Sequence, residues 1–141
     1  MRAASEPLTG GEKSDPDALP APQPSATPQP PMQPETIRAA LARIAPHLLA
    51  DFDRDRAAST ARARAEVSAT PLRTFTEAWA VEVAIARHPE TADRLRALEA
   101  RAGEVADLGE AREIAAEISR IRRTAATEAG VRTVGARRAA S

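Results

Sequence analysis

The distribution of proline is the feature that most restricts what this chain can fold into. Nine of its twelve prolines lie in residues 1–34, and the other three, Pro46, Pro71 and Pro89, are spaced along the rest of the chain. Proline lacks a backbone N–H and is tolerated only in the first turn of a helix. The N-terminal quarter is therefore unsuited to helix, whereas each later proline predicts a point where a helix begins.

The N-terminal segment also has very little that it could bury. Its large apolar side chains are only Met1, Leu8, Leu19 and Met32. A segment so poor in apolar surface cannot offset the entropy lost on ordering. We therefore predict a disordered tail over residues 1–34, locally in the polyproline II conformation and dispensable for folding. Its two PxxP spacings are interpreted as what dense prolines produce by chance, with a docking motif as the competing interpretation.

From Glu35 onward the composition favours helices. Apolar residues recur at helical spacing, no segment alternates as a strand would, and no internal repeat is visible. The fold class predicted is all-α, a small alanine-rich bundle of four to five helices with disordered N-terminal and C-terminal tails. The helices are expected at about residues 35–45, 46–69, 71–87, 90–102 and 105–127.

Local signals divide the helical part further. Thr70 is expected to cap the third helix, with Pro71 as its first residue, and Gly103 is expected to end the fourth. Four parts are expected. A tail covers residues 1–34 and a helical core domain covers 35–102. An amphipathic helix with a short seam like that of a coiled coil covers 103–129, and a disordered basic tail covers 130–141.

The expected third helix carries two apolar strips. One is an ordinary core stripe of Leu72, Phe75, Trp79, Val83 and Ala86, and the other consists of Ala78, Val81 and Ile85. We assign Trp79 to the core, because a single tryptophan on a helical stripe is the usual core pattern. A helix with two such strips is either surrounded within its own domain or covered by a partner. Glu82 lies between the strips and must reach water or an arginine, or anchor a partner's cation.

The expected fifth helix carries an apolar seam at 3–4 spacing, formed by Ala111, Ile114, Ile118, Ile121 and Ala125. This spacing is the a/d pattern of a coiled coil. With Ala111 at position a, Glu117 falls at g and Arg122 at e, so opposite charges would meet across a parallel pair. Two interpretations remain open: the seam packs on the chain's own helices, or it joins another subunit or a partner chain.

Two sets of candidate binding residues follow from these patterns. The C-terminal arginines are candidates for contacting nucleic acid, although no helix-turn-helix pattern accompanies them and a solvated tail is the competing interpretation. They are Arg120, Arg123, Arg132, Arg137 and Arg138. The candidates for a protein interface are Val81, Glu82, Ile85, Ile114, Glu117, Ile118, Ile121 and Arg122.

Composition and motifs argue against catalysis. Nineteen arginines and one lysine balance twenty acids, so net charge does not draw the chain to nucleic acid or an anionic membrane. Cysteine is absent, which excludes disulfides and thiolate metal sites.

His47 and Asp51 share a helix face but are too few for a metal site, and Asp51, Asp53 and Asp55 lack the glycine of a calcium loop. We find no phosphate loop or nucleophile motif and expect no enzyme, metal, cofactor or small-molecule substrate.

The expected location is the cytoplasm of a bacterium. The N-terminus has no apolar region of the length that a signal peptide needs. No run approaches the roughly 18 apolar residues of a membrane span. The abundance of arginine and alanine is typical of GC-rich coding.

Four features together resemble a known family: the PETIRAAL opening, the LLADFDRD helix, the helix with Trp79 and the HPE break. They resemble a family of uncharacterised small helical proteins of high-GC bacteria, over about residues 34–100. Such proteins often accompany small toxin-like proteins, and the resemblance therefore implies an antitoxin-like binding role. The function expected is a non-catalytic helical protein-interaction module, with a small DNA-associated regulator as the alternative.

Overall fold

The computed structural model of the chain describes residues 27–132, and this part contains five α-helices, one short 3-10 helix and no strand. The expected all-α class is therefore confirmed. The helices are α1 (Pro34–Ile44), η1 (Pro46–Leu48), α2 (Leu49–Glu66), α3 (Thr70–Ala86), α4 (Pro89–Ala102) and α5 (Leu108–Ala129).

Prolines mark the starts of these helices as expected. Pro34, Pro46, Pro71 and Pro89 each lie in the first turn of a helix, where a missing N–H leaves no bond unmade. The cap of α3 differs by one residue from the prediction. Ala69 is the N-cap and Thr70 is already helical, because the Ser68 hydroxyl accepts the Thr70 N–H at 3.1 Å.

The fifth helix begins three residues later than expected. Asp107 is its N-cap, and the Asp107 carboxylate accepts the backbone N–H of Glu110 at 2.8 Å. Residues 103–107 connect it to α4. The N–H groups of Glu104 and Val105 bond back to the carbonyl of Arg101 and so continue the last turn of α4. Gly103 does end α4, but with an ordinary φ of −75°.

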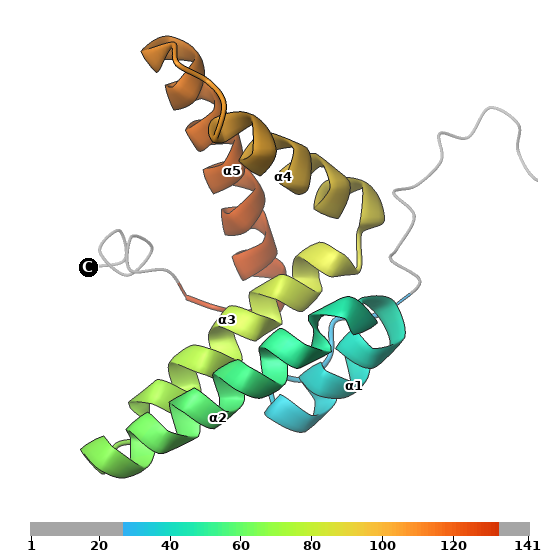
Figure 1. The fold of residues 1–141 in the computed structure, drawn as a ribbon. Coiled ribbons are helices and arrows are strands. Elements are labelled where there is room, and N and C mark those ends of the chain that lie inside the picture. Colours follow the sequence, from blue (N-terminus) through green and yellow to red (C-terminus); the bar gives the residue numbers. More distant parts are fainter. Residues whose placement is uncertain (1–26, 133–141) are drawn as a thin grey trace, which may run out of the picture.

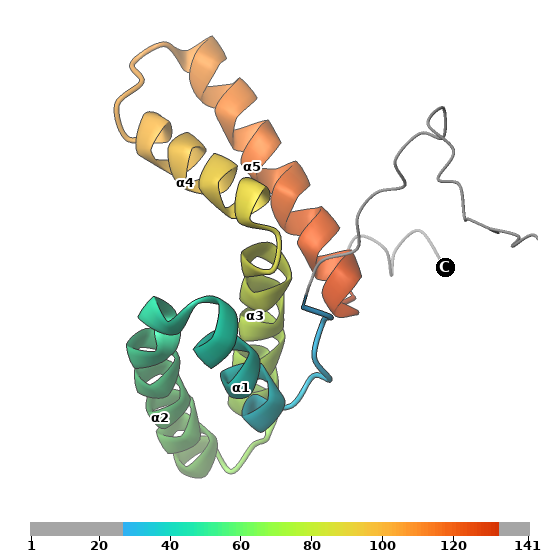
Figure 2. The same ribbon diagram turned by 90° about the vertical axis from the view of Figure 1, so that its right-hand side faces the viewer.

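α3 is the central helix of the fold. It packs against α1 and α2 on one side and against α4 and α5 on the other (Figures 1 and 2). The α4–α5 hairpin projects from the C-terminal end of α3, and the last turns of α5 return to lie beside α3. Helices of the same chain thus cover α3 on two sides, although Ala78 of its second apolar strip is exposed.

Two apolar clusters hold these helices together. The N-terminal cluster joins α1, α2 and α3 around Phe52, which is fully buried, as are Ile37, Leu41 and Val83. The C-terminal cluster joins α3, α4 and α5 through Ala84, Ile85, Leu95 and Ala125. α3 contributes to both clusters and so connects the two halves of the fold.

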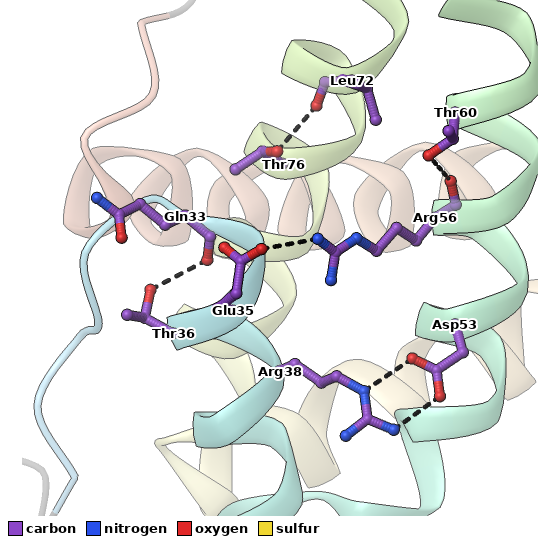
Figure 3. Close-up of polar contacts among 9 residues, drawn as sticks. All are labelled: Gln33, Glu35, Thr36, Arg38, Asp53, Arg56, Thr60, Leu72 and Thr76. Atoms are coloured by element: carbon purple, nitrogen blue, oxygen red, sulfur yellow. Dashed lines mark hydrogen bonds and ion pairs between the residues drawn. The ribbon is translucent and has the colours of Figure 1, made fainter.

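Ion pairs at the surface connect α1 to α2 (Figure 3). Arg38 donates two hydrogen bonds of 2.8 Å to the carboxylate of Asp53, and Arg56 donates one of 2.8 Å to Glu35. Exposed pairs of this kind contribute little, typically about 0–1 kcal/mol. They fix the register of the two helices, whereas the N-terminal cluster holds them together.

The folded part begins earlier than the expected boundary at residue 34. Residues 27–33 lie against α3 and lead into α1 (Figure 2). The amide of Gln29 donates to the carbonyl of Ala80 at 3.0 Å, and the guanidinium of Arg87 donates to the carbonyl of Thr27 at 3.2 Å. The rest of the expected tail, residues 1–26, lies outside the described residues, as does 133–141.

Candidate functional site

A hollow with a largely apolar lining lies where the two halves of the described fold meet. We call it the junction groove. It has a volume of about 430 Å³, and its apolar lining comes from the α1–η1 turn, the last turns of α3 and the start of α4. The apolar side chains are Ile44, Ala45, Leu48, Ile85, Ala86, Pro89, Ala92 and Leu95.

Proline explains why this groove forms. Pro46 ends α1 and starts η1, and Pro89 ends α3 and starts α4, so the chain turns sharply at both places. The two turns leave Leu48 and Ala92 facing a common hollow. Both side chains are half-buried, so the floor presents apolar surface that the chain does not cover completely.

Charged side chains of both signs line the groove beside the apolar floor. Arg122 of α5 reaches across and donates to Glu82 of α3 and Glu99 of α4, each at 3.1 Å. Partial burial acts to lower the pKa of Arg122, but the hydrogen bonds to the two carboxylates outweigh it and raise that pKa. Arg96 pairs with Asp93 one turn away on α4. Three helices are thus linked by one guanidinium at the side of the groove.

Glu82 and Arg122 were both candidates for a partner interface, and the structure brings them together within the chain. The expectation that Glu82 must reach water or an arginine is confirmed by its contact with Arg122. The two residues are 40 positions apart in the sequence. Their side chains remain 36% and 42% exposed, so the pair is accessible at the groove.

The apolar interface candidates lie inside the chain's own packing. Ile85 is buried in the C-terminal cluster, and Val81, Ile118 and Ile121 pack against that cluster. Ile114 is also buried, with 7% of its surface exposed. The seam thus contacts the chain's own helices, as the internal interpretation expects, while Ile118 and Ile121 stay partly exposed.

Glu117, placed at position g of the seam, pairs with α4. Its two oxygens accept hydrogen bonds of 2.8 Å from Nε and Nη2 of Arg94. This bidentate contact lowers the pKa of the Glu117 carboxyl, with the field of the same arginine adding to the effect. The charge that would have met a partner helix in a coiled coil therefore meets the neighbouring helix of the same chain.

The candidates for nucleic acid lie on the outside of α5 and beyond its end. Arg120, Arg123 and Arg132 are exposed, and none makes an ion pair with a described residue. Arg137 and Arg138 fall outside the described residues. Arg120 nevertheless lies close enough to Glu117 for its charge to lower the pKa of that carboxyl.

No group of three or more His, Asp or Glu side chains in residues 27–132 is close enough to hold a metal ion. His47 is exposed at the edge of the junction groove, and His88 contacts Glu128 of α5 at 3.1 Å. Asp51 pairs with Arg54, Asp53 with Arg38, and Asp55 accepts from Trp79, so the three aspartates point to different partners.

Sequence reasoning missed several residues of the site. Ile44, Leu48 and Ala92 line the groove but were not among the candidate binding residues. The available signal was the pair of prolines, Pro46 and Pro89, since each sharp turn exposes the end of one apolar stripe. Nothing in the sequence indicated that the two turns lie side by side.

Comparison of the chain with protein-family models, with curated proteins and with solved structures found no match in any of the three. Among the described helices, none has the length and apolar character that crossing a bilayer requires. The resemblance of residues 34–100 to small helical proteins of high-GC bacteria therefore stays a prediction from the sequence.

Proposed function

We propose that this protein is a non-catalytic helical protein-interaction module, and that its junction groove binds an amphipathic helix of a partner protein. The observation that carries the proposal is the apolar floor of the groove. It is built from three separate elements and is bordered by charged groups of both signs. Such a groove suits a helix whose apolar face lies on the floor while its flanking charges meet the rim.

The internal packing of the fifth-helix seam supports this choice of surface. Ile114 is buried, and Ile118 and Ile121 are partly buried against the C-terminal cluster, so less of the seam than of the groove floor is offered to a partner. Ala86 and Ala92 in the groove are half-buried and small, so a partner's larger side chains would fit over them. An antitoxin-like regulator acting in the bacterial cytoplasm is the specific role that the sequence resemblance adds to the proposal.

A matched pair of substitutions on α4 tests the proposal. Ala92→Arg fills the junction groove with a long cation, whereas Ala97→Arg places the same side chain at an exposed position that does not line it. Both variants and the wild type are used as bait in extract of the source cells, after melting curves establish that all three are folded. We expect one partner to be retained by wild type and Ala97→Arg and reduced about tenfold or more by Ala92→Arg.

Capture that is equal for the two variants would refute the junction groove as the binding surface. The salt dependence of capture gives a second criterion. Binding through an apolar floor should survive an increase in salt, whereas binding through charges alone should not.

A small DNA-associated regulator is the second candidate function. Arg120, Arg123 and Arg132 favour it, because they are exposed and form no ion pair with a described residue, although Arg120 lies in the field of Glu117. Fluorescence anisotropy with a labelled duplex at several salt concentrations tests it. The candidate requires binding that weakens steeply with salt and that Arg120→Ala together with Arg123→Ala reduces. Duplex binding that is the same at every salt concentration and in the doubly substituted chain would refute the DNA-associated candidate.

A further inference from the structure

The side of α3 that residues 27–33 cover is a second surface, separate from the junction groove. Residues 27–33, which we call the strap, pass along α3 with neither helical nor strand hydrogen bonding. Thr27 is held by Arg87 at the end of α3, and Gln29 is held at Ala80, two turns earlier on the same helix. The strap therefore runs antiparallel to α3. None of the residues in these two contacts lines the junction groove.

The chemistry of the strap suits the helical surface beneath it. Helices bond their own N–H and C=O groups internally and offer no free ladder to an extended peptide. An ordinary peptide laid on such a surface would leave its own N–H groups without partners. Pro28, Pro30 and Pro31 have no N–H and avoid that cost. Proline also holds the peptide extended before it docks, which reduces the entropy lost on binding.

Two specific contacts then fix the position of the strap. The Gln29 amide reaches a backbone carbonyl of α3 at Ala80, a residue that is about 1% exposed and too small to obstruct it. Arg87 holds the carbonyl of Thr27 at one end, and its guanidinium also contacts Glu128 of α5 at 3.4 Å. One end of the strap is therefore linked through Arg87 to the end of α5.

One atom of the strap is poorly accommodated. The carbonyl oxygen of the Gln29 side chain is buried and accepts no hydrogen bond from the described residues. Reversing the amide would not help, because it would point an oxygen at the Ala80 carbonyl. A buried acceptor without a donor opposes docking, since it could be hydrated in the undocked strap. Hydrogen bonds thus hold the strap at one position on α3, although one of its buried polar atoms has no hydrogen-bond partner among the described residues.

We propose that the α3 surface between Ala80 and Arg87 is a binding site for extended proline-rich peptides of other proteins. The ligand is a peptide with the chemistry of the strap, a glutamine flanked by prolines. Its amide donates to the carbonyl of Ala80 and one of its backbone carbonyls accepts from Arg87. The chain's own strap occupies the site in the absence of that peptide and competes with it.

Competition between strap and peptide makes a reciprocal prediction. Removing the amide from the strap frees the site and strengthens binding of an external peptide, whereas removing it from the external peptide weakens binding. The two changes act on the same hydrogen bond and should therefore be of similar size. We expect the dissociation constant of the external peptide to change roughly fivefold in each direction, which is the effect of one typical hydrogen bond.

The experiment uses the full chain and a fluorescein-labelled octapeptide with the sequence of residues 27–34, TPQPPMQP, followed by anisotropy. Wild type, Gln29→Ala and Gln33→Ala chains are titrated with this peptide and with TPAPPMQP. Gln33 is a matched control, because it is a second glutamine of the strap and its side chain is exposed. Circular dichroism of each chain establishes that the helices are retained.

The expected result is that Gln29→Ala binds TPQPPMQP about fivefold more tightly than wild type and Gln33→Ala do. The alanine peptide should bind all three chains more weakly. No binding of TPQPPMQP to Gln29→Ala at millimolar concentration, or equal binding by all three chains, overturns the proposal. Neither outcome affects the junction groove, because the Ala92→Arg comparison tests that surface separately.

Discussion

At the scale of single residues, the core depends on very few side chains. The chain has two phenylalanines, one tryptophan and no tyrosine, and all three aromatic rings meet in the N-terminal cluster. The ring of Phe52 lies 5.0 Å from Phe75 and 5.4 Å from Trp79, the latter edge to face. The indole N–H of Trp79 donates to Asp55 at 3.2 Å, which satisfies its polar atom. The assignment of Trp79 to the core is therefore confirmed.

Trp79→Ala should cost about 3–5 kcal/mol in unfolding free energy, the usual range for a buried aromatic side chain. The change removes a ring neighbour from Phe52 and a hydrogen-bond donor from Asp55, and we expect the domain to be largely unfolded at 37 °C. Chemical denaturation followed by circular dichroism measures it. Leu108→Ala, at an apolar residue that is 63% exposed, is the control and should stay close to wild type. An unchanged melting temperature in Trp79→Ala would contradict the core assignment.

Val67 is the residue whose backbone is least suited to its side chain. It ends α2 with a φ of +51°, the left-handed region, although its side chain is β-branched and 90% exposed. At the end of α5 the same conformation is taken by Gly130, for which it is unstrained. The strain at Val67 is not compensated by any burial of its side chain.

Val67→Gly should therefore stabilise the protein by about 0.5–1 kcal/mol, the strain relieved less the extra flexibility of glycine when unfolded. Ala65→Gly, at an exposed position two residues earlier in α2, is the control and should destabilise by up to about 1 kcal/mol. Urea denaturation of the two variants should give shifts of opposite sign. A loss of stability in both would show that Val67 is held there by something other than local strain.

At the scale of elements, the sequence predicted the number and order of helices but not their relation in space. Prolines and apolar spacing are local signals, and they placed most boundaries within a few residues. The start of α5 was wrong by three residues, because Asp107 makes a stronger cap than the apolar Val105 that opens the pattern. The pairing of Arg94 with Glu117 could not be predicted, since the same spacing also fits a partner helix.

The contact between α4 and α5 should make stability depend on pH. The hydrogen bonds from Arg94 place the pKa of Glu117 below its ordinary value of 4.5. A carboxyl with a lowered folded pKa contributes stability above its unfolded pKa and loses that contribution as the pH falls through the folded pKa. Acidification below about pH 4.5 should therefore weaken the link between the two helices.

Melting temperatures of wild type and Glu117→Gln at several pH values measure this contribution. Wild type should melt higher near pH 6, and the difference should shrink below about pH 4.5 as Glu117 becomes protonated. Glu113→Gln is the control, because Glu113 is exposed on the same helix and pairs with no described residue. A difference in melting temperature between wild type and Glu117→Gln that stays constant down to pH 3 would mean that the ionised pair of Arg94 and Glu117 contributes nothing to stability.

At the scale of the whole molecule, the two halves are held by α3 and by the strap. Composition alone suggested that all of residues 1–34 would be dispensable, because it does not reveal hydrogen bonds to positions 51 and 60 residues away. The geometry changes that expectation for residues 27–33. The junction groove was equally invisible to the sequence, because it forms between two turns that are distant along the chain.

Two truncations separate the strap from the residues before it. Removal of residues 1–26 should leave the unfolding free energy unchanged, since that segment has almost no apolar side chains. Removal of residues 1–33 should lower it by about 1–2 kcal/mol, the value of the two hydrogen bonds to α3. Equal stability of both truncated chains would show that the strap adds nothing to the fold.

We propose that the seam of α5 completes the chain's own fold and that the junction groove is the surface for a partner. Ile118→Asp tests it most directly, because it places a charge where α5 packs against α3 and α4. Ser119→Asp, at the exposed neighbouring position, is the control. Sedimentation and melting curves are recorded for both variants and wild type. We predict a monomeric wild type, a loss of about 2–4 kcal/mol in Ile118→Asp and little change in Ser119→Asp. An oligomeric wild type that Ile118→Asp separates into monomers of unchanged melting temperature would contradict the claim.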